Sequence, residues 1–317
     1  KILLLKMNSI VSGNSFSDAA YLARHVSLVD VPKETSALTA NRLCGSGFQF
    51  IVYGCQETCV KIAEVVLCEG AKSMAPYCVR NVCIITKLGS DFKLEALTGL
   101  HVQVPIGIAA ENFAAKHKIS REEFKKHPAV TAEMKAANDA RYFNNEMISV
   151  MIRLNTNKPG AVNYLTSSSF KEERTITVRN VSEISDPFID SEDAVKNNNF
   201  TLARTVGYFV PRCDFSVVDI DLVPASSGAL KKRRPSLKDM DLVEVNGDFA
   251  PQYLAVEKSL DFNPSKTKVN GSPLAGSGSR IIAHTVHELR CGGGEYAGES
   301  AYIEGGQYIT LSIWNSA

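Results

Sequence analysis

Runs of residues typical of strands alternate with runs typical of helices along this chain, and this alternation constrains the fold more than any other feature. Short apolar runs with strand character lie at Glu64–Cys68 and Leu242–Val245. Apolar residues with helical spacing occupy Gly47–Ile62 and Phe249–Leu260. This order predicts an α/β fold. The 317 residues are enough for one large domain or two of medium size.

The composition of the chain changes between residues 153 and 190, where Asn, Ser, Thr, Lys and Glu dominate. This change predicts loops and edge structure. A strand-like pattern resumes at Thr201–Val210, so we place the boundary between two halves near residue 195. The charged helical pattern of residues 113–146 predicts a solvated helical surface.

Composition also argues against several classes of partner. The formal net charge is +1, which provides no overall field for binding nucleic acid or an anionic membrane. No apolar run approaches the length of a transmembrane helix, so we expect no membrane insertion. The eight cysteines are scattered rather than spaced as a disulfide framework, which favours a reducing compartment. Because no His or Cys cluster completes a zinc pattern, we expect no metal site.

A cysteine stands at the junction of a small-residue turn and a helix in the segment Asn41–Gln49. The residues Gly45–Gly47 leave the first backbone N–H groups of the helix open to a ligand, and the positive end of the helix dipole favours a thiolate there. This arrangement predicts that Cys44 is a nucleophile. Free cysteines are commonly buried as small hydrophobic residues, so the residue chemistry alone leaves both interpretations open. The helix itself is predicted from recurring apolar residues at Phe48, Ile51, Val52, Cys55, Cys59 and Ile62.

The segment around Cys44 resembles the nucleophile segment of thiolases, in which this position holds the acyl-accepting cysteine. The resemblance covers most of residues 1–155 and 190–317, and it is strongest toward mitochondrial members of the family. Lys1–Leu3 resembles the second strand region of the family, so we expect the chain to begin after the first. Other segments that resemble thiolases are Thr39–Asn41, Gly54–Glu57, Ala63–Cys68, Ala110–Asn112, Leu242–Asn246, Phe249–Tyr253 and Gly276–Arg280.

The resemblance implies an architecture that the pattern alone does not give. Thiolases have two similar halves packed as α-β-α-β-α layers, with a loop domain inserted in the first half. In this chain the N-terminal half would span residues 1–195 and the C-terminal half residues 196–317. The inserted loop domain would lie at roughly residues 76–176.

The resemblance also implies an activity, that of an acyl-CoA C-acyltransferase in mitochondrial fatty-acid β-oxidation. A 3-ketoacyl-CoA and CoA would become a shortened acyl-CoA and acetyl-CoA through a thioester on Cys44. Asn246 matches the residue that holds the water of an oxyanion hole, and Ser182 matches a serine that contacts the pantetheine of CoA. CoA and acyl-CoA would be substrates rather than cofactors. The implied location is the mitochondrial matrix, and the implied assembly is a homodimer or homotetramer.

Two positions depart from the family pattern in ways that affect catalysis. Ser272 falls where the family carries a histidine base, and Tyr302 replaces the second catalytic cysteine. Neither side chain can transfer protons efficiently near neutral pH, so we expect impaired turnover. His284 and His287 follow on a helix, where we expect them to be partly exposed and not to replace the base. A non-catalytic protein that binds CoA esters or pairs with an intact subunit, and a decayed copy that does not fold stably, stay open as alternatives.

Overall fold

The structure is a computed structural model. It describes residues 7–13, 21–28, 31–70, 104–126, 147–152, 174–179, 188–190, 202–211, 239–246, 250–260, 263, 266–268, 277–303 and 307–315. Within these ranges the strands form three sheets. The first sheet has the order β2-β1-β3-β6, and β1 runs parallel to both of its neighbours. Its strands are β1 (Ser9–Gly13), β2 (Ser36–Ala40), β3 (Val65–Gly70) and β6 (Phe188–Asp190).

The second sheet belongs to the C-terminal part of the chain and has the order β7-β11-β10-β8-β9. β10 lies parallel to β8 and antiparallel to β11. The strands are β7 (Arg204–Phe209), β8 (Leu242–Asn246), β9 (Thr267–Lys268), β10 (Tyr296–Ile303) and β11 (Gln307–Trp314). A separate two-stranded sheet consists of β4 (Met147–Ile152) and β5 (Arg174–Arg179).

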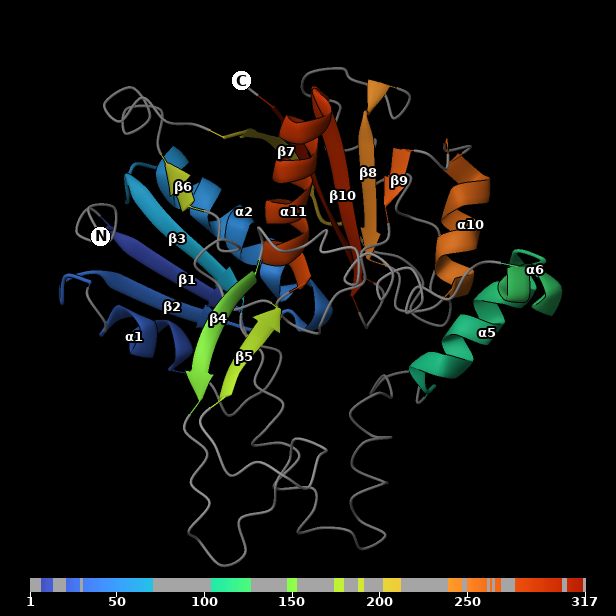
Figure 1. The fold of residues 1–317 in the computed structure, drawn as a ribbon, viewed down its shortest axis with the longest axis horizontal. Coiled ribbons are helices and arrows are strands. Elements are labelled where there is room, and N and C mark those ends of the chain that lie inside the picture. Colours follow the sequence, from blue (N-terminus) through green and yellow to red (C-terminus); the bar gives the residue numbers. More distant parts are fainter. Residues whose placement is uncertain are drawn as a thin grey trace, which may run out of the picture.

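Helices cover the sheets in layers (Figure 1). α2 and α11 lie between the two larger sheets, α1 packs on the outer face of the first sheet, and α10 and α5 pack on the outer face of the second. This arrangement confirms the predicted α/β fold with α-β-α-β-α layers. The helices are α1 (Leu22–Ser27), α2 (Ser46–Cys59), α5 (Ile106–Lys116), α6 (Arg121–Lys126), α10 (Ala250–Leu260) and α11 (Ser277–Gly292).

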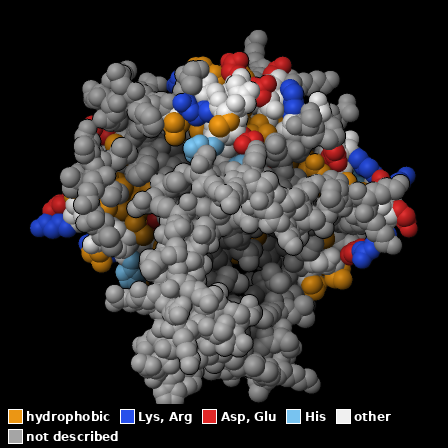
Figure 2. Space-filling model, in the orientation of Figure 1, with side chains coloured by type: hydrophobic (Ala, Val, Ile, Leu, Met, Phe, Trp, Pro, Cys, Tyr) orange, Lys and Arg blue, Asp and Glu red, His pale blue; other side chains and the backbone are white. Residues whose placement is uncertain are grey.

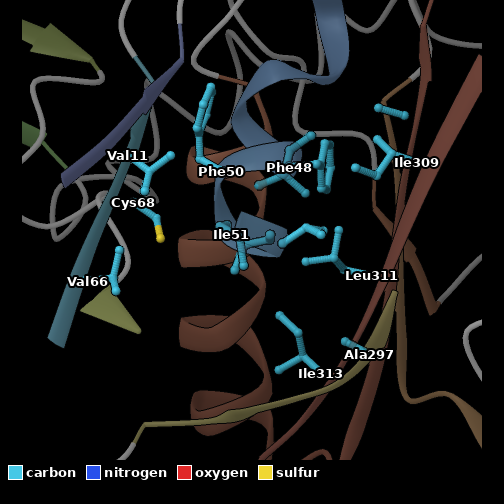
Figure 3. Packing of buried hydrophobic residues seen from close by; sticks show 14 of the residues in the cluster. Val11, Phe48, Phe50, Ile51, Val66, Cys68, Ala297, Ile309, Leu311 and Ile313 are labelled. Carbon is cyan, nitrogen blue, oxygen red and sulfur yellow. The ribbon is translucent and has the colours of Figure 1, made fainter. Parts of the chain in front are cut away.

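The main core lies in the central layer, where both sheets press apolar side chains against α2 and α11 (Figure 3). Val11 and Val66 reach it from the first sheet. Successive side chains of a strand point to opposite faces. On β10, Ala301 and Ile303 therefore face this layer, whereas Tyr302 joins a second cluster with α10 and α5. The two faces of the second sheet thus serve two separate cores.

The central helices touch at their N-terminal ends, and glycines allow that approach. A Cβ atom added at Gly47 would lie 2.7 Å from the Gly278 nitrogen and 2.9 Å from the Ser279 nitrogen. Contacts this short against backbone leave no room for a side chain. The N-terminal ends of α2 and α11, which both carry partial positive charge, therefore lie side by side in the layer between the sheets.

Two expectations from the sequence were wrong, one about the end of a helix and one about the exposure of a histidine. The predicted helix extends only to Cys59, because Lys61 takes a left-handed backbone with φ of 59° and Ile62 is 74% exposed. His284 is 1% exposed rather than partly exposed, because α11 is a central helix enclosed by both sheets. His287, by contrast, is partly exposed as expected.

The surface that the structure describes carries mixed charge. Figure 2 shows acidic and basic side chains interspersed on one face, as they are around α5 and α6, where Arg121 lies 3.7 Å from Glu111. Charged side chains of these helices such as Lys116 and Glu122 are exposed, in agreement with the predicted solvated surface. Phe113 and Ala114 are instead buried in a core cluster with α10, so the prediction was wrong for them. The side chains of residues 124–146 lie outside the described part of the chain. Among the helices described, none is long and apolar enough to cross a bilayer.

Candidate active site

Cys44 lies in a tight turn that connects β2 to α2. This turn is the 3-10 helix η3 (Leu43–Gly45), and α2 begins directly after it at Ser46. Leu43 has a left-handed φ of 49°, which is unusual for a side chain with a Cβ atom. The Asn41 side chain supports this conformation, because its Oδ1 accepts the Leu43 N–H at 2.7 Å. The sequence prediction of a cysteine at the start of a helix is therefore confirmed, and Cys44 lies within the 3-10 turn that leads directly into α2.

The first turn of α2 offers its backbone N–H groups without a side-chain cap. The N-cap residue is Gly45, and no side chain caps the helix there. The Ser46 hydroxyl instead joins the turn, because it accepts the Arg42 N–H at 2.8 Å and donates to the Leu43 carbonyl at 2.7 Å. Cys44 thus lies beside the positive end of a helix, where an anion is stabilised.

The turn packs directly against the end of β10. A Cβ atom at Gly45 would meet Ile303, whose Cγ1 would be 2.6 Å away. A second connection comes from Arg42, whose guanidinium donates to the Oε1 of Gln307, at the start of β11. The nucleophile segment from the N-terminal part of the chain therefore packs against one end of the C-terminal sheet, where β10 finishes and β11 begins.

Asn246 lies at the same end of that sheet. It ends β8, is half-buried, and pairs with Ala301 of the parallel strand β10. Directly paired residues of parallel strands place their side chains on the same face, and Ala301 faces the central layer. Asn246 therefore points to the layer that holds α2 and α11, at the carboxyl ends of the strands, where open α/β sheets bind ligands. The structure brings Asn246 and the Cys44 turn to the same end of the C-terminal sheet.

Tyr302 lies on the other face. It is 5% exposed and packs edge-on against Tyr308, with ring centroids 5.3 Å apart. Its other neighbours in the cluster include Phe113 of α5 and Tyr253 of α10. The residue that the resemblance aligns with the second cysteine is therefore part of a hydrophobic core, and its ring faces away from the layer to which Asn246 points.

Other predicted site residues lie outside the part of the chain that the structure describes. These are Ser182 and Ser272, together with most of the expected loop domain at residues 76–176. Among the described residues, no group of three or more His, Cys, Asp or Glu side chains could hold a metal ion.

Four other described cysteines differ in environment from Cys44. Burial raises the pKa of Cys55 to about 11, although a hydrogen bond with Thr205 opposes this shift. Cys68 is buried between the first sheet and α2, and Cys59 and Cys291 are exposed. Exposure alone would therefore make Cys59 and Cys291 the most reactive thiols. Of the five cysteines that the structure describes, only Cys44 combines partial exposure with a position at a helix N-terminus.

We predict that Cys44 reacts first with limiting iodoacetamide at neutral pH, because the helix terminus favours its thiolate. Peptide mapping of the singly alkylated protein gives the order of modification. The exposed cysteines serve as internal controls for access. Faster modification of Cys59 or Cys291 would show that exposure, and not activation, governs thiol reactivity in this chain.

Two family models match nearly the whole chain. The model described as "Thiolase, N-terminal domain" matches residues 6–187, and the one described as "Thiolase, C-terminal domain" matches residues 200–314. The chain belongs to the thiolase family. It is similar to the mitochondrial 3-ketoacyl-CoA thiolase of Homo sapiens, with 56% identity over 98% of this chain and 87% of that protein.

Solved structures of thiolases agree with this assignment. The crystal structure of human mitochondrial 3-ketoacyl-CoA thiolase has a TM-score of 0.80 and 50% identity, covering 98% of this chain and 88% of that one. The same human protein in complex with CoA gives a TM-score of 0.78 and 53% identity, covering 98% of this chain and 87% of that one. The thiolase resemblance seen in the sequence is thereby confirmed.

Sequence reasoning missed the partnership between Arg42 and Gln307 in this thiolase-family chain. The two residues are 265 positions apart, and neither spacing nor periodicity connects them. The available signal was the adjacency of each residue to a recognised segment, since Arg42 precedes Cys44 and Gln307 follows Gly305-Gly306.

Proposed function

We propose that this chain is a thiolase-type acyl-CoA C-acyltransferase in which Cys44 carries the acyl group as a thioester. The observation that supports this proposal most strongly is the Cys44 turn at the start of α2, seated against the strand ends where Asn246 lies. The thiolate would attack the keto carbon of a 3-ketoacyl-CoA, and the bond to the acetyl-CoA carbanion would break. The carbanion would take a proton and leave as acetyl-CoA. CoA would then accept the acyl group from Cys44 and release it as the shortened acyl-CoA.

Each further site residue has a limited role in this proposal. Asn246 would hold a water that donates to the developing oxyanion, since it ends a strand at the edge where Cys44 lies. Ser182 would contact the pantetheine arm of CoA, which rests on sequence resemblance alone. The human relative was crystallised with CoA, which supports CoA esters as ligands. Its mitochondrial name supports the matrix as the location. We also propose that the boundary between the two halves of the chain lies near residue 195.

An acyl-CoA labelling experiment tests the proposed thioester. After incubation with an acyl-CoA, intact-mass analysis should show one added acyl group in the parent protein and none in Cys44→Ala. Cys59→Ala is the matched control, because it removes an exposed cysteine outside the site. An acyl adduct that persists in Cys44→Ala, or its absence in a folded parent protein, would contradict the proposed nucleophile.

Complete turnover should be slow even where acylation succeeds. The resemblance places Ser272 at the histidine position, and Tyr302 packs into a hydrophobic cluster. Each proton-transfer group typically contributes about 10²–10⁴-fold to rate. We therefore expect thiolysis of a 3-ketoacyl-CoA at least about a thousandfold slower than that of the human relative assayed in parallel. A comparable rate would mean that another residue supplies the missing proton transfer.

A non-catalytic protein that binds CoA esters or pairs with an intact thiolase subunit is the second proposal. The packing of Tyr302 favours this second proposal, because its side chain is buried in a hydrophobic core and does not face the site. The two proposals differ in the labelling experiment above. A folded chain that binds acyl-CoA in equilibrium dialysis without forming an adduct supports the second.

We also propose that the folded chain is a dimer or larger homo-oligomer. Within the described ranges β2 is an edge strand of the first sheet, and its Leu38 is 44% exposed. Edge strands with exposed apolar residues tend to associate. Light scattering at micromolar concentration should therefore give at least twice the mass of 34.5 kDa. A single monomer peak with a cooperative thermal transition would contradict this proposal.

A further inference from the structure

Arg42 makes an unusual set of contacts beside the nucleophile. Its Nη1 donates to the Oε1 of Gln49 on α2, while its Nε and Nη2 donate to the Oε1 of Gln307 at 3.4 and 3.3 Å. Gln307 begins β11, so one side chain joins the helix after Cys44 to the C-terminal sheet. The planar guanidinium can hold both partners at once, which a lysine could not do in the same geometry.

The main chain of Arg42 closes the turn that contains Cys44. The Arg42 carbonyl accepts the Gly45 N–H at 3.0 Å, and the Arg42 N–H donates to the Ser46 hydroxyl at 2.8 Å. Cys44 lies between these contacts. The left-handed backbone at Leu43, which few residues adopt, lies within the same closed turn. Such a conformation persists only where its surroundings hold it.

The acceptors of the guanidinium are neutral. Gln49 and Gln307 both accept through amide oxygens, and within the described part of the chain no carboxylate pairs with Arg42. Among the described residues, these amide partners fix the orientation of the guanidinium without neutralising its positive charge. In a half-buried place such as this, a fixed charge acts more strongly on nearby groups than it would in water.

We propose that Arg42 is a positioning residue that holds the Cys44 turn against the C-terminal sheet through Gln49 and Gln307. Cys44 comes from the N-terminal half and Asn246 from the C-terminal half, so their relative placement depends on contacts between the halves. Arg42 provides such a contact two residues before Cys44. Loss of the contact should leave both halves folded while displacing the thiol from the helix terminus.

The inference rests on Cys44 being the proposed nucleophile, and its test uses alkylation, which does not require acyl transfer. In Arg42→Met and in Gln307→Leu, the rate of Cys44 alkylation by iodoacetamide should fall at least about tenfold, since small displacements of a reacting group cost that much or more. The rates at Cys59 and Cys291 in the same molecules should not change. The double variant should be no slower than Arg42→Met alone, because that variant already lacks the contact that Gln307→Leu removes.

Arg24→Met is the matched control, since Arg24 is exposed on α1 and, among the described residues, its guanidinium donates only to the Ser27 hydroxyl and the Lys33 carbonyl. An unchanged Cys44 rate in folded Arg42→Met and Gln307→Leu would overturn the proposal. Faster alkylation of the buried Cys68 would also overturn it, because Arg42 would then stabilise the fold and not the placement of the thiol. If neither variant folds, the same conclusion holds. If Cys44 alkylation slows in both variants as expected but the parent protein forms no acyl adduct with acyl-CoA, the result counts against the proposed function alone.

Discussion

Replacing Gly278 by alanine is expected to destabilise the protein by about 3 kcal/mol or more, at the upper end of the effects seen for overpacked cores. A Cβ atom at this position would overlap the Phe48 backbone nitrogen and lie 2.5 Å from the Gly47 carbonyl carbon. Both are backbone atoms of α2, which cannot move aside as a flexible side chain could. The two central helices would have to separate, and the packing of both sheets depends on them.

Urea unfolding of Gly278→Ala and of Gly292→Ala tests this expectation. Gly292 lies in the last turn of the same helix, is exposed, and has no atom within 4 Å of an added Cβ. Its replacement should change the free energy of unfolding by less than about 1 kcal/mol. Failure of Gly278→Ala to fold would agree with the prediction. A midpoint equal to that of the parent would show that α2 and α11 do not approach so closely.

Replacing Glu299 by glutamine is expected to stabilise the protein at neutral and alkaline pH. Glu299 is 0% exposed on β10 and is paired in register with Glu244 of β8, which is 2% exposed. Burial raises the pKa of Glu299 well above its ordinary value; the nearby Thr285 hydroxyl partly offsets this, and repulsion from Glu244 adds to it. Parallel pairing places both carboxyl groups on one face.

The sign of the effect follows from proton linkage. The folded state binds the Glu299 proton more tightly than the unfolded chain, in which the pKa is about 4.3. The stabilising contribution is therefore fully present below about pH 4 and is lost as the pH rises through the raised pKa of the folded state. Between these two values, the free energy of unfolding of the parent should fall by about 1.4 kcal/mol per pH unit through this group.

The difference in unfolding free energy between Glu299→Gln and the parent, measured from pH 4 to pH 9, isolates this contribution. It should grow in favour of the variant as the pH rises. Glu122→Gln is the control, because Glu122 is an exposed glutamate on α6. A pH-independent difference would mean that Glu299 ionises in the folded protein at an ordinary pH.

Local sequence patterns determined the elements of this protein. The strands Val65–Gly70 and Leu242–Asn246 were predicted from the short apolar runs at 64–68 and 242–245. The helices Ser46–Cys59 and Ala250–Leu260 were predicted, with somewhat different ends, from apolar spacing at 47–62 and 249–260. Such patterns depend on neighbouring residues alone. The position of Cys44 at the start of a helix was predictable for the same reason. Resemblance to thiolases added the layered order of those elements.

The tertiary structure alone decided which side chains meet. α11 has polar residues on several sides, yet His284 and Thr285 are buried because the helix lies between two sheets. The facing glycines Gly47 and Gly278 and the partners Arg42 and Gln307 are far apart in sequence. Such pairs leave no periodic signal, because their proximity arises only when the two sheets close on the central helices. The sequence therefore placed Cys44 at the start of a helix, and the packing of the two halves determined the surroundings in which that cysteine lies.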